Sequence, residues 1–467
     1  MRRQILLGLS VLALTGCANR VSYKPPVSAP LAAATDWNTP LPGGVNAKPA
    51  DDKALAQWWE ALNDPILTSL EQRALKGNLD LRKAEARIRQ ARALRNAAQT
   101  ELKPTVNASG SANGGRSSGR TGFAQTSQSY SAGLDASWEP DFFGRIRQSI
   151  DAYNADIDTA QEDLRNTLVS LTAELALDYV DVRSYQAQLA TTQANLKSQR
   201  DTYDLTVARY ESGLATQLDA EQARLTVEST AASIPTLEAA RQKAVNAIAG
   251  LLGERPGSID SELAAAKPVP AVPSQITVGV PADLVRRRPD IRSAERQVAA
   301  QTARLGVTMA NLNPAFTLSG ALSLNSTTIQ NLVTPAALAS SLAGSVSQTV
   351  FNRRKLHEQV NAQDAVVDEY IAAYQSTVLT ALQDVENALD AFGKEHARRK
   401  SLVQANEAAE RAAAMSRELY SAGLKDFLTV LDAERSQLTL QNELVQCDAA
   451  IAADLVRLYK SLGGGWN

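Results

Sequence analysis

Two stretches of the chain, one in each half, alternate between apolar and polar residues. In the first stretch the apolar positions are Tyr130, Ala132, Leu134, Ala136 and Trp138, and the positions between them are Ser131, Gly133, Asp135 and Ser137. In the second stretch Phe316, Leu318, Leu322 and Leu324 alternate with Thr317, Ser319, Ala321 and Ser323. A period of two residues predicts strands with one apolar face and one small polar face. A further strand is predicted from Ser341 to Val350, which gives hairpins at about residues 104–140 and 314–351.

Helix-breaking residues are missing over long distances after each predicted hairpin. Neither Gly nor Pro occurs from Arg145 to Ser212, and only Gly393 interrupts the segment from Arg354 to Ala422. At about 1.5 Å per residue, an unbroken helix over the first segment would reach roughly 100 Å. Helices of globular proteins average only about 11 or 12 residues. We therefore expect two very long helices, arranged as a coiled coil or a rod.

A Gly-Leu pair interrupts the helical pattern at the end of each long segment. The first pair, Gly213 and Leu214, lies in YESGLATQLDAEQARL, and the second, Gly423 and Leu424, lies in YSAGLKDFLTVLDAERSQL. Glycine lets a chain reverse where a β-carbon would obstruct the turn. We expect a tight turn between two helices at each pair.

The chain matches itself at a constant offset. Asp80 aligns with Asp290 and Pro104 with Pro314, and the two glycines of the turns align as well (290 − 80 = 314 − 104 = 423 − 213 = 210). Matches in three separate segments predict a duplicated unit. We place the first copy at residues 61–263 and the second at 285–467, joined by a Pro-rich linker at 264–284.

The N-terminus has the pattern of an export signal. Basic residues come first, an apolar run follows, and small residues precede Cys17. The sequence LTGC resembles the lipobox of bacterial lipoproteins, in which a signal peptide, here residues 1–16, is cut off and the cysteine then carries a lipid. Ala18 fits sorting to the outer membrane. We expect residues 17–60 to form an acylated, extended segment, the alternative being an ordinary secretory signal with an incidental cysteine.

Composition argues against several classes of function. Lys and Arg number 48 and Asp and Glu number 50, so the net charge is −2, and no long basic run favours nucleic acid as a partner. Only two histidines occur, and no HExxH, CxxC or phosphate-binding loop is present. We expect no catalytic site, no metal and no cofactor beyond the covalent lipid on Cys17.

Four amphipathic strands fit a membrane barrel shared between chains. Strands that are apolar outside and polar inside suit lipid on one side and water on the other. Every strand edge within lipid must be closed, and about eight strands are the practical minimum for a barrel. Four strands cannot close, so two chains would supply eight strands or three chains twelve.

Several motifs, in this order, resemble a known family. They are the lipobox, DFFGR at 141–145, RRPDI at 287–291, FLTVLDAERSQL at 427–438 and the terminal LGGGW. Together with the repeat, they resemble TolC-like outer-membrane factors, specifically the NodT-type lipoproteins of RND efflux systems. The fold this implies is mainly α-helical with a small membrane β part: a homotrimer with a twelve-stranded outer-membrane barrel and a long periplasmic barrel of helices.

The same resemblance implies a function and partners. The chain would be the passive exit duct of a tripartite efflux system that exports small toxic compounds or drugs, working with a periplasmic adaptor, an inner-membrane RND pump and outer-membrane lipid. An exit duct of a type I protein secretion system is the nearest alternative. A structural coiled-coil lipoprotein of the envelope is the alternative from another class.

The family resemblance also assigns a closable periplasmic mouth to the two turns. Asp219 matches an acidic residue that bonds across helices to a tyrosine, here Tyr420, and to a basic residue, here Lys425. Asp432 matches one of two acidic residues that line the mouth. Thr429 replaces the other, for which Asp426 could compensate. The simpler alternative is that Asp219 caps a helix and that Asp432 belongs to a solvated helix face.

Overall fold

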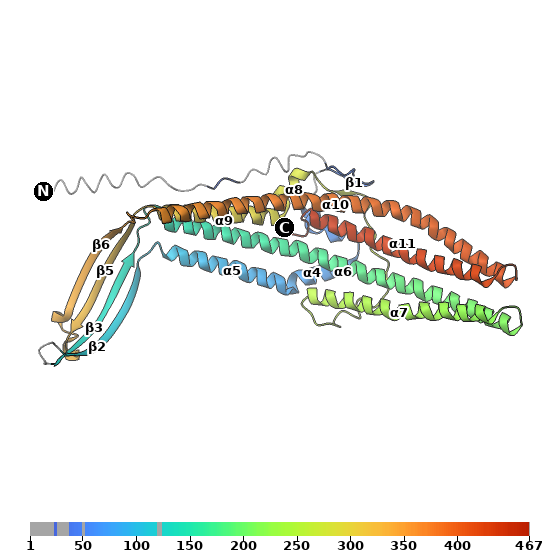
Figure 1. Cartoon of the computed structure of the whole chain (residues 1–467), viewed down its shortest axis with the longest axis horizontal. Helices are drawn as coiled ribbons and strands as arrows, with labels where there is room; N and C mark the ends of the chain where they lie inside the picture. The colour runs from blue at the N-terminus through green and yellow to red at the C-terminus, as the bar shows by residue number, and fades with distance from the viewer. Residues whose placement is uncertain (1–22, 26–36, 49–51, 119–123, 467) are drawn as a thin grey trace. The chain divides into compact units, whose positions relative to one another are not determined.

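The computed structural model describes the whole chain apart from residues 1–22, 26–36, 49–51, 119–123 and 467 (Figure 1). Cys17 and the predicted signal peptide lie outside the described residues. The described chain divides into two compact units. Among the described residues, the first unit contains 23–25, 86–118, 124–161 and 293–375, and the second contains 37–48, 52–85, 162–292 and 376–466.

The first unit contains a sheet of four antiparallel strands (Figure 1). Their order is β2 (Thr105–Ser118), β3 (Ala124–Trp138), β5 (Ala315–Ser326) and β6 (Leu338–Ser347). Both predicted hairpins are therefore present. The last strand ends at Ser347 rather than at Val350 because Ser347 pairs with Ala315, and the preceding Pro314 has no N–H with which to extend the ladder.

Helices make up most of the remaining chain, and their bounds follow the repeat. The first copy contains α4 (Pro65–Gly77), α5 (Leu79–Thr100), α6 (Arg145–Glu211) and α7 (Gln217–Leu251). The second contains α8 (Pro281–Arg287), α9 (Pro289–Ala310), α10 (Arg354–Ser421) and α11 (Phe427–Ser461). The repeat offset relates both ends of α5 to those of α9, and both ends of α7 to those of α11 (289 − 79 = 310 − 100 = 427 − 217 = 461 − 251 = 210).

The two longest helices confirm the prediction from the missing glycines and prolines. Helix α6 has 67 residues and α10 has 68, and each contributes residues to both units. Gly393 lies inside α10 without breaking it. A Cβ at this position would come within 3.0 Å of Pro42, so the glycine leaves room for the N-terminal segment to pass. None of the helices within the described ranges has the length and apolar character needed to cross a membrane.

Short elements fill the parts that were predicted to be an extended segment or a linker. Strand β1 (Val45–Asn46) pairs in parallel with β4 (Ile276–Thr277), which lies inside the predicted linker. Within the segment predicted to be extended, α3 (Asp52–Ala56) and the 3₁₀ helix η1 (Trp58–Leu62) are helical instead. The reason is burial, because the side chains of this segment join the core of the second unit, among them Leu55, Trp58, Trp59 and Leu62.

Candidate functional site

The sheet of the first unit separates apolar from polar side chains on its two faces. Leu134 pairs across the strands with Leu322, and Phe316 pairs with Val346, so these side chains share one face. That face is open, since Leu322 is 49% and Val346 63% exposed. On the other face Asn107 donates to Asp135 at 3.1 Å, and the Ser111 and Ser131 hydroxyls lie 2.9 Å apart. The sheet therefore suits an apolar medium on one side and water on the other.

Both edges of this sheet are unpaired. The order β2-β3-β5-β6 leaves β2 and β6 with one neighbour each among the described strands. An unpaired edge presents a row of N–H and C=O groups that can pair with another chain. Every residue of β6 is exposed, including the apolar side chains of Leu338 and Leu342. A single chain therefore leaves the sheet incomplete.

The DFFGR motif forms the junction between the sheet and α6. Phe142 packs edge-on against Phe316 with ring centroids 5.1 Å apart. The Asp141 carboxylate accepts hydrogen bonds from the first backbone N–H groups of α6, at 3.2 Å from Ile146 and 2.9 Å from Arg147. Aromatic residues at the end of an amphipathic sheet are typical of a membrane–water boundary.

The two Gly-Leu pairs form the same tight turn at the ends of α6 and α10. Gly213 has a φ of 74° and Gly423 one of 76°. In the first turn the N–H of Gly213 donates to Tyr210 and that of Leu214 to Arg209, at 2.9 and 2.8 Å. The second turn makes both bonds again between the residues that the repeat aligns with these. This is the Schellman motif, and it confirms the two predicted helix breaks. Helices α6 and α7 thus form one helical hairpin, and α10 and α11 form another (Figure 1).

The helix after each turn begins with one Thr and one Asp that together cap its N-terminus. The two residue types occupy opposite positions in the two copies. In the first copy Thr216 is the N-cap of α7 and Asp219 closes a capping box, accepting hydrogen bonds from the Thr216 N–H and hydroxyl at 2.9 and 2.8 Å. In the second copy Asp426 is the N-cap of α11 and accepts from the Thr429 N–H at 3.0 Å. Hydrogen bonds from Thr429 hold the pKa of Asp426 below its usual value. Thr429 and Asp426 are therefore partners in one cap.

Tyr420 lies at the meeting point of the two helical hairpins. Its ring is buried against Ala223, Phe427 and Val430 in a small apolar cluster. Its hydroxyl lies 3.4 Å from that of Thr206 on α6. The Asp219–Tyr420 hydrogen bond that the resemblance implied is thus not formed within a single described chain, because the Asp219 carboxylate binds Thr216 instead.

At the turns, Arg209 joins the two hairpins, and sequence reasoning missed this residue. Its guanidinium donates to the carbonyl oxygens of Tyr420 and Ser421 at 2.9 and 3.2 Å. It also lies over the Tyr420 ring, 4.8 Å from the centroid. A cation at the C-terminal end of a helix is favourably placed against the helix dipole. We call Arg209, Tyr420 and Ser421 the Arg209 clamp.

A break in the repeat could have revealed this clamp. Arg209 aligns with Leu419 in the second copy (419 − 209 = 210). Such a mismatch marks a position where the two copies differ, although Lys425 opposite Ala215 is a second mismatch of the same kind. Family resemblance instead drew attention to Asp219 and Lys425.

The remaining predicted residues of the turns are open to solvent. Lys425 and Asp432 are exposed, and neither side chain has a hydrogen-bond or ion-pair partner within the described chain. Four leucines form matching pairs with exposures between 50 and 70%: Leu214, Leu218, Leu424 and Leu428. The two turns therefore carry an exposed apolar surface.

Polar contacts continue from the turns along α6. They join α6 to α11: Gln188 with Gln446 at 3.3 Å, Asn195 with Gln441 at 2.6 Å, and Thr202 with Glu434 at 2.9 Å. Arg417 of α10 adds an ion pair to Glu434 at 3.3 Å. Polar pairs in a helical seam specify the register at a cost in stability. The contact between α6 and α11 therefore fixes the register of the two helices but stabilises their packing less than an apolar contact would.

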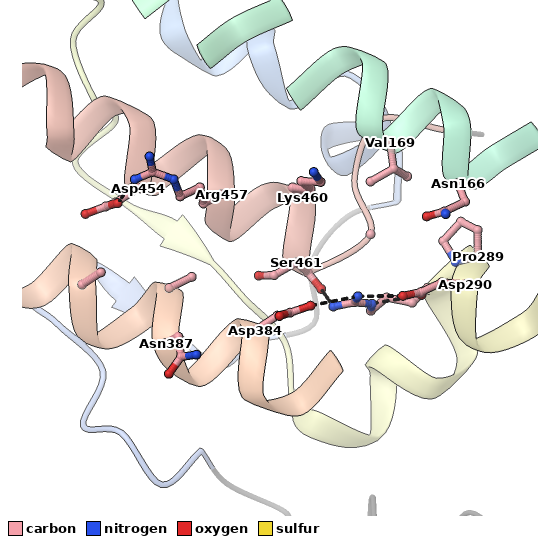
Figure 2. Close-up of a pocket in the computed structure, with 14 residues that line it drawn as sticks. Asn166, Val169, Pro289, Asp290, Asp384, Asn387, Asp454, Arg457, Lys460 and Ser461 are labelled. Carbon is pink, nitrogen blue, oxygen red and sulfur yellow. Dashed lines mark hydrogen bonds and ion pairs between the residues drawn. The ribbon is translucent and has the colours of Figure 1, made fainter. Parts of the chain in front are cut away.

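A separate cavity of about 460 Å³ in the second unit is lined in part by Arg288, Pro289 and Asp290 of the RRPDI motif (Figure 2). Arg288 donates to Asp290 at 2.7 Å, to Asp384 at 3.2 Å and to the Ser461 carbonyl at 2.9 Å. The last bond has a counterpart in the first copy, where Asn78 donates to the Leu251 carbonyl at 2.8 Å (288 − 78 = 461 − 251 = 210). Each bond joins the end of the last helix of a copy to the residue just before α5 or α9 of the same copy, so we assign this motif a structural role.

An amphipathic sheet with two open edges, together with long helical hairpins that end in matching turns, defines a class of protein: the outer-membrane channels of the TolC type. Comparison with known proteins gives the family. The profile of the family described as "Outer membrane efflux protein" matches residues 70–254 and 280–464, and the chain belongs to this family. The offset between the two matches equals that of the repeat (280 − 70 = 464 − 254 = 210).

Individual relatives match over nearly their whole length. The chain is 32% identical over 466 residues to nodulation protein T of Rhizobium leguminosarum, covering 98% of this chain and 96% of the relative. It is 30% identical over 481 residues to the toluene efflux pump outer membrane protein TtgI of Pseudomonas putida, covering 100% and 99%. Among solved structures, the outer-membrane channel OprN matches with 35% identity and a TM-score of 0.84, covering 97% of this chain and 99% of that one.

These findings establish the fold class, location and general function expected from the sequence. The chain is an outer-membrane efflux duct with a mainly α-helical fold, a small β part and an internal twofold repeat. The matched family and structure are channels rather than enzymes.

Proposed function

We propose that three copies of the chain form one passive exit duct, whose periplasmic mouth lies at the turns after α6 and α10 and closes through the Arg209 clamp. The clamp is the observation that supports this proposal most directly. It is the contact in which a charged side chain of the first helical hairpin holds the helix end of the second. If the second hairpin moves outward as the mouth opens, these bonds must break.

Strand counting supports three copies. In a ring of chains β2 of one copy would pair with β6 of the next, which closes both open edges. Eight strands, from two copies, enclose an interior that side chains fill, whereas larger barrels leave an aqueous channel. Twelve strands therefore suit a duct that must pass whole molecules.

The strength of the clamp suits a reversible gate. A hydrogen bond to a charged group contributes about 1.5–3 kcal/mol, and the half-buried position of Arg209 favours the lower end of this range. The polar seam between α6 and α11 lowers the cost of moving one hairpin against the other. Closure is then favoured at rest, but a docked partner could reverse it.

Charged residues of the turns would act between copies. Three Asp432 carboxylates in a ring would repel one another and attract cations. Asp219 and Lys425 are assigned to contacts between neighbouring copies, since the bonds of Asp219 within the chain are to its own cap. Asp426 and Thr429 hold the second turn in shape through their own cap.

The exposed leucines at the turns would bind the tip of a periplasmic adaptor, which connects the duct to an inner-membrane RND pump. Small toxic compounds are the proposed cargo, supported by the relative named as a toluene efflux protein. A lipid on Cys17 would anchor the N-terminus in the outer membrane, and no other cofactor is proposed. The family membership and the named relative favour efflux over protein secretion and over a purely structural role.

Loss of the gene tests this assignment. We expect a strain without the chain to become sensitive to solvents and drugs, while its secreted proteins stay unchanged. We also expect an adaptor and a pump to co-purify with the affinity-tagged chain after cross-linking. Normal resistance combined with missing secreted proteins would support the type I secretion alternative instead.

A further inference from the structure

Two helices of the first unit carry side chains of opposite charge. In positions 86–100 of α5 the charged residues are all arginines: Arg87, Arg89, Arg92 and Arg95. In positions 356–372 of α10 they are all carboxylates: Glu358, Asp364, Asp368 and Glu369. Apart from the half-buried Arg95, all of these side chains are exposed. We call the two sets the α5 arginines and the α10 carboxylates.

Most of these charges have no partner within the chain. Arg95 donates to the side chains of Asn96 and Asn154. Glu358 pairs with Arg354 one helical turn earlier. The other members of both sets make no hydrogen bond or ion pair with a described residue. Helix α5 and the first part of α10 also lie at opposite borders of this unit (Figure 1). The two sets therefore do not neutralise one another within one chain.

The same unit contains a contact between a basic and an acidic side chain of two helices, α9 and α6. Ala299 of α9 belongs to one apolar cluster with Ala155 of α6. Next to this cluster Arg304 of α9 donates to both carboxylate oxygens of Asp156 on α6, at 2.7 and 3.0 Å. An arginine of the helix that leads into β5 thus pairs with an aspartate of the helix that follows β3.

The repeat relates this contact to the two open sets of charges. Helix α5 and strand β2 align with α9 and β5, and β3 and α6 align with β6 and α10 (304 − 94 = 315 − 105 = 366 − 156 = 210). Within the chain β5 pairs with β3, and α9 packs against α6. The aligned elements are β2 and α5 of one copy and β6 and α10 of the next. The proposed pairing of β2 with β6 therefore continues into a contact of α5 with α10.

Burial at aligned positions agrees with this relation. Ala155 of α6 is 8% exposed, whereas the aligned Ala365 of α10 is open to solvent. Ala299 of α9 is also 8% exposed, whereas the aligned Arg89 of α5 is open (365 − 155 = 299 − 89 = 210). The surfaces that α6 and α9 cover within one chain are thus uncovered on α10 and α5.

We infer that the α5 arginines of one copy bind the α10 carboxylates of the next, so that the partner of this surface is a second copy of the same chain. This inference rests on the three-copy duct of the proposed function. The aligned positions place Arg89 against Ala365, with Glu369 one helical turn further along α10. They also place Leu94 against Val366.

Charge complementarity of this kind selects the partner as well as the orientation. An apolar contact bordered by opposite charges fixes which helices pair. Like charges would repel a copy that placed α5 against α5, or α10 against α10. The surface therefore favours a ring in which every α5 meets an α10.

Reversal of charge tests the pairing. Arg89→Glu with Arg92→Glu should lower the yield of heat-modifiable trimer several-fold, and Asp364→Arg with Glu369→Arg should do the same. All four changes in one chain should restore the yield, because every contact then joins opposite charges again. Full yield from either reversed pair, or a fourfold variant with no more trimer than the pairs, would overturn the inference.

The matched control reverses two charges on another helix. Lys197 and Arg200 are exposed on α6 and have the same spacing as Arg89 and Arg92. Lys197→Glu with Arg200→Glu should leave the trimer yield unchanged. An equal loss in this control would mean that any reversal of two charges disturbs assembly, which would overturn the specific pairing.

Cross-linking tests the same contact without reversing a charge. Leu94→Cys with Val366→Cys, treated with a short bifunctional maleimide, should give covalent dimers and trimers on a reducing denaturing gel, and each single variant should remain monomeric. Arg304→Cys with Asp156→Cys, the aligned pair inside one chain, is the matched control and should cross-link within the monomer. A trimeric parent whose Leu94 and Val366 variant gives no covalent oligomer would overturn the inference alone. A parent that forms no trimer would instead overturn the three-copy duct.

Discussion

Arg209 holds the end of helix α10 by donating to the carbonyl oxygens of Tyr420 and Ser421, at 2.9 and 3.2 Å, while it covers the Tyr420 ring. The two turns that it joins share the same backbone bonds and the same positive φ at glycine. Arg209 itself is not duplicated, because Leu419 stands at the matching position of the second copy. A duct that opens by moving one hairpin and not the other needs such a difference.

The contacts of Arg288 with Asp290, Asp384 and the Ser461 carbonyl should contribute more to the free energy of unfolding than an exposed ion pair does. The Arg288→Ala substitution leaves Asp290 and Asp384 without their shared cation and the Ser461 carbonyl without its donor. Breaking a fully buried ion pair costs about 3–5 kcal/mol, and the partial exposure of Asp290 and Asp384 should reduce this cost to about 2 kcal/mol. Lys83→Ala, which removes an exposed pair with Asp80, should cost less than about 1 kcal/mol. Thermal unfolding of the two variants in detergent would compare them, and equal melting temperatures would contradict the structural role of Arg288.

Stability should rise on mild acidification through Asp178 of α6. Burial, and then the neighbouring Glu174 and Asp181 carboxylates, raise the pKa of Asp178 to about 6. The folded chain therefore binds a proton below pH 6 that the unfolded chain binds only below about pH 4. The stability that this proton contributes is present at low pH and is lost as the pH rises through 6.

Asp178→Asn removes this dependence. In a fully buried group, this rise in pKa would change the free energy of unfolding by about 3 kcal/mol. Because Asp178 is only half-buried, solvent screening reduces the expected change to about 1 kcal/mol. The variant should unfold at a higher temperature than the parent at pH 7.5, and the gap should shrink as the pH falls through 6 and close below about pH 4. Glu228→Gln, on an exposed position of α7, serves as the control. A gap of constant size across this pH range would rule out Asp178 as its source.

The two helix caps should protect the first turn of their helices equally, although Thr and Asp occupy opposite positions in the two caps. Thr216→Ala and Asp426→Ala each remove the N-cap side chain that accepts a hydrogen bond from the first turn of the following helix. Without this acceptor the first turn opens more often. Faster hydrogen exchange is therefore expected in the first turn of α7 for one variant and of α11 for the other. Asp432→Ala should leave exchange in both turns as it is, since its carboxylate caps neither helix. Slower or unchanged exchange in the capping variants would contradict the caps.

Much of the fold follows from sequence periodicity. The hairpins were predictable because alternation along a whole strand leaves one face apolar, and the long helices because their segments contain almost no helix breaker. Strand β2 was predicted only as part of a hairpin, since its Gly, Ser and Asn residues have little β-propensity and it depends on pairing with β3. Strands β1 and β4 are too short to produce any pattern.

The sequence predicted where the candidate site lies, but not which hydrogen bonds its side chains make. Both turns were located by their glycines, since a positive φ there excludes most other residues. The partners of Asp219 and Asp426 were not, because a carboxylate near a helix start can equally cap the helix or bind across to a neighbour. Arg209 was missed because its partners are backbone carbonyls, so the sequence carries no sign of them beyond the mismatch of Arg209 with Leu419 in the repeat.

Single-channel conductance in planar bilayers tests the central claim, that the chain forms a duct whose mouth the Arg209 clamp holds closed. The test variant is Arg209→Leu, which places at this position the residue that the second copy carries. Arg200→Leu, an exposed position on the same helix, makes the same change of charge away from the clamp. We expect the purified trimer to conduct, the Arg209 variant to conduct clearly more, and the Arg200 variant to match the parent. An intact Arg209→Leu trimer with the conductance of the parent would contradict the clamp, and a parent trimer that does not conduct would contradict the duct.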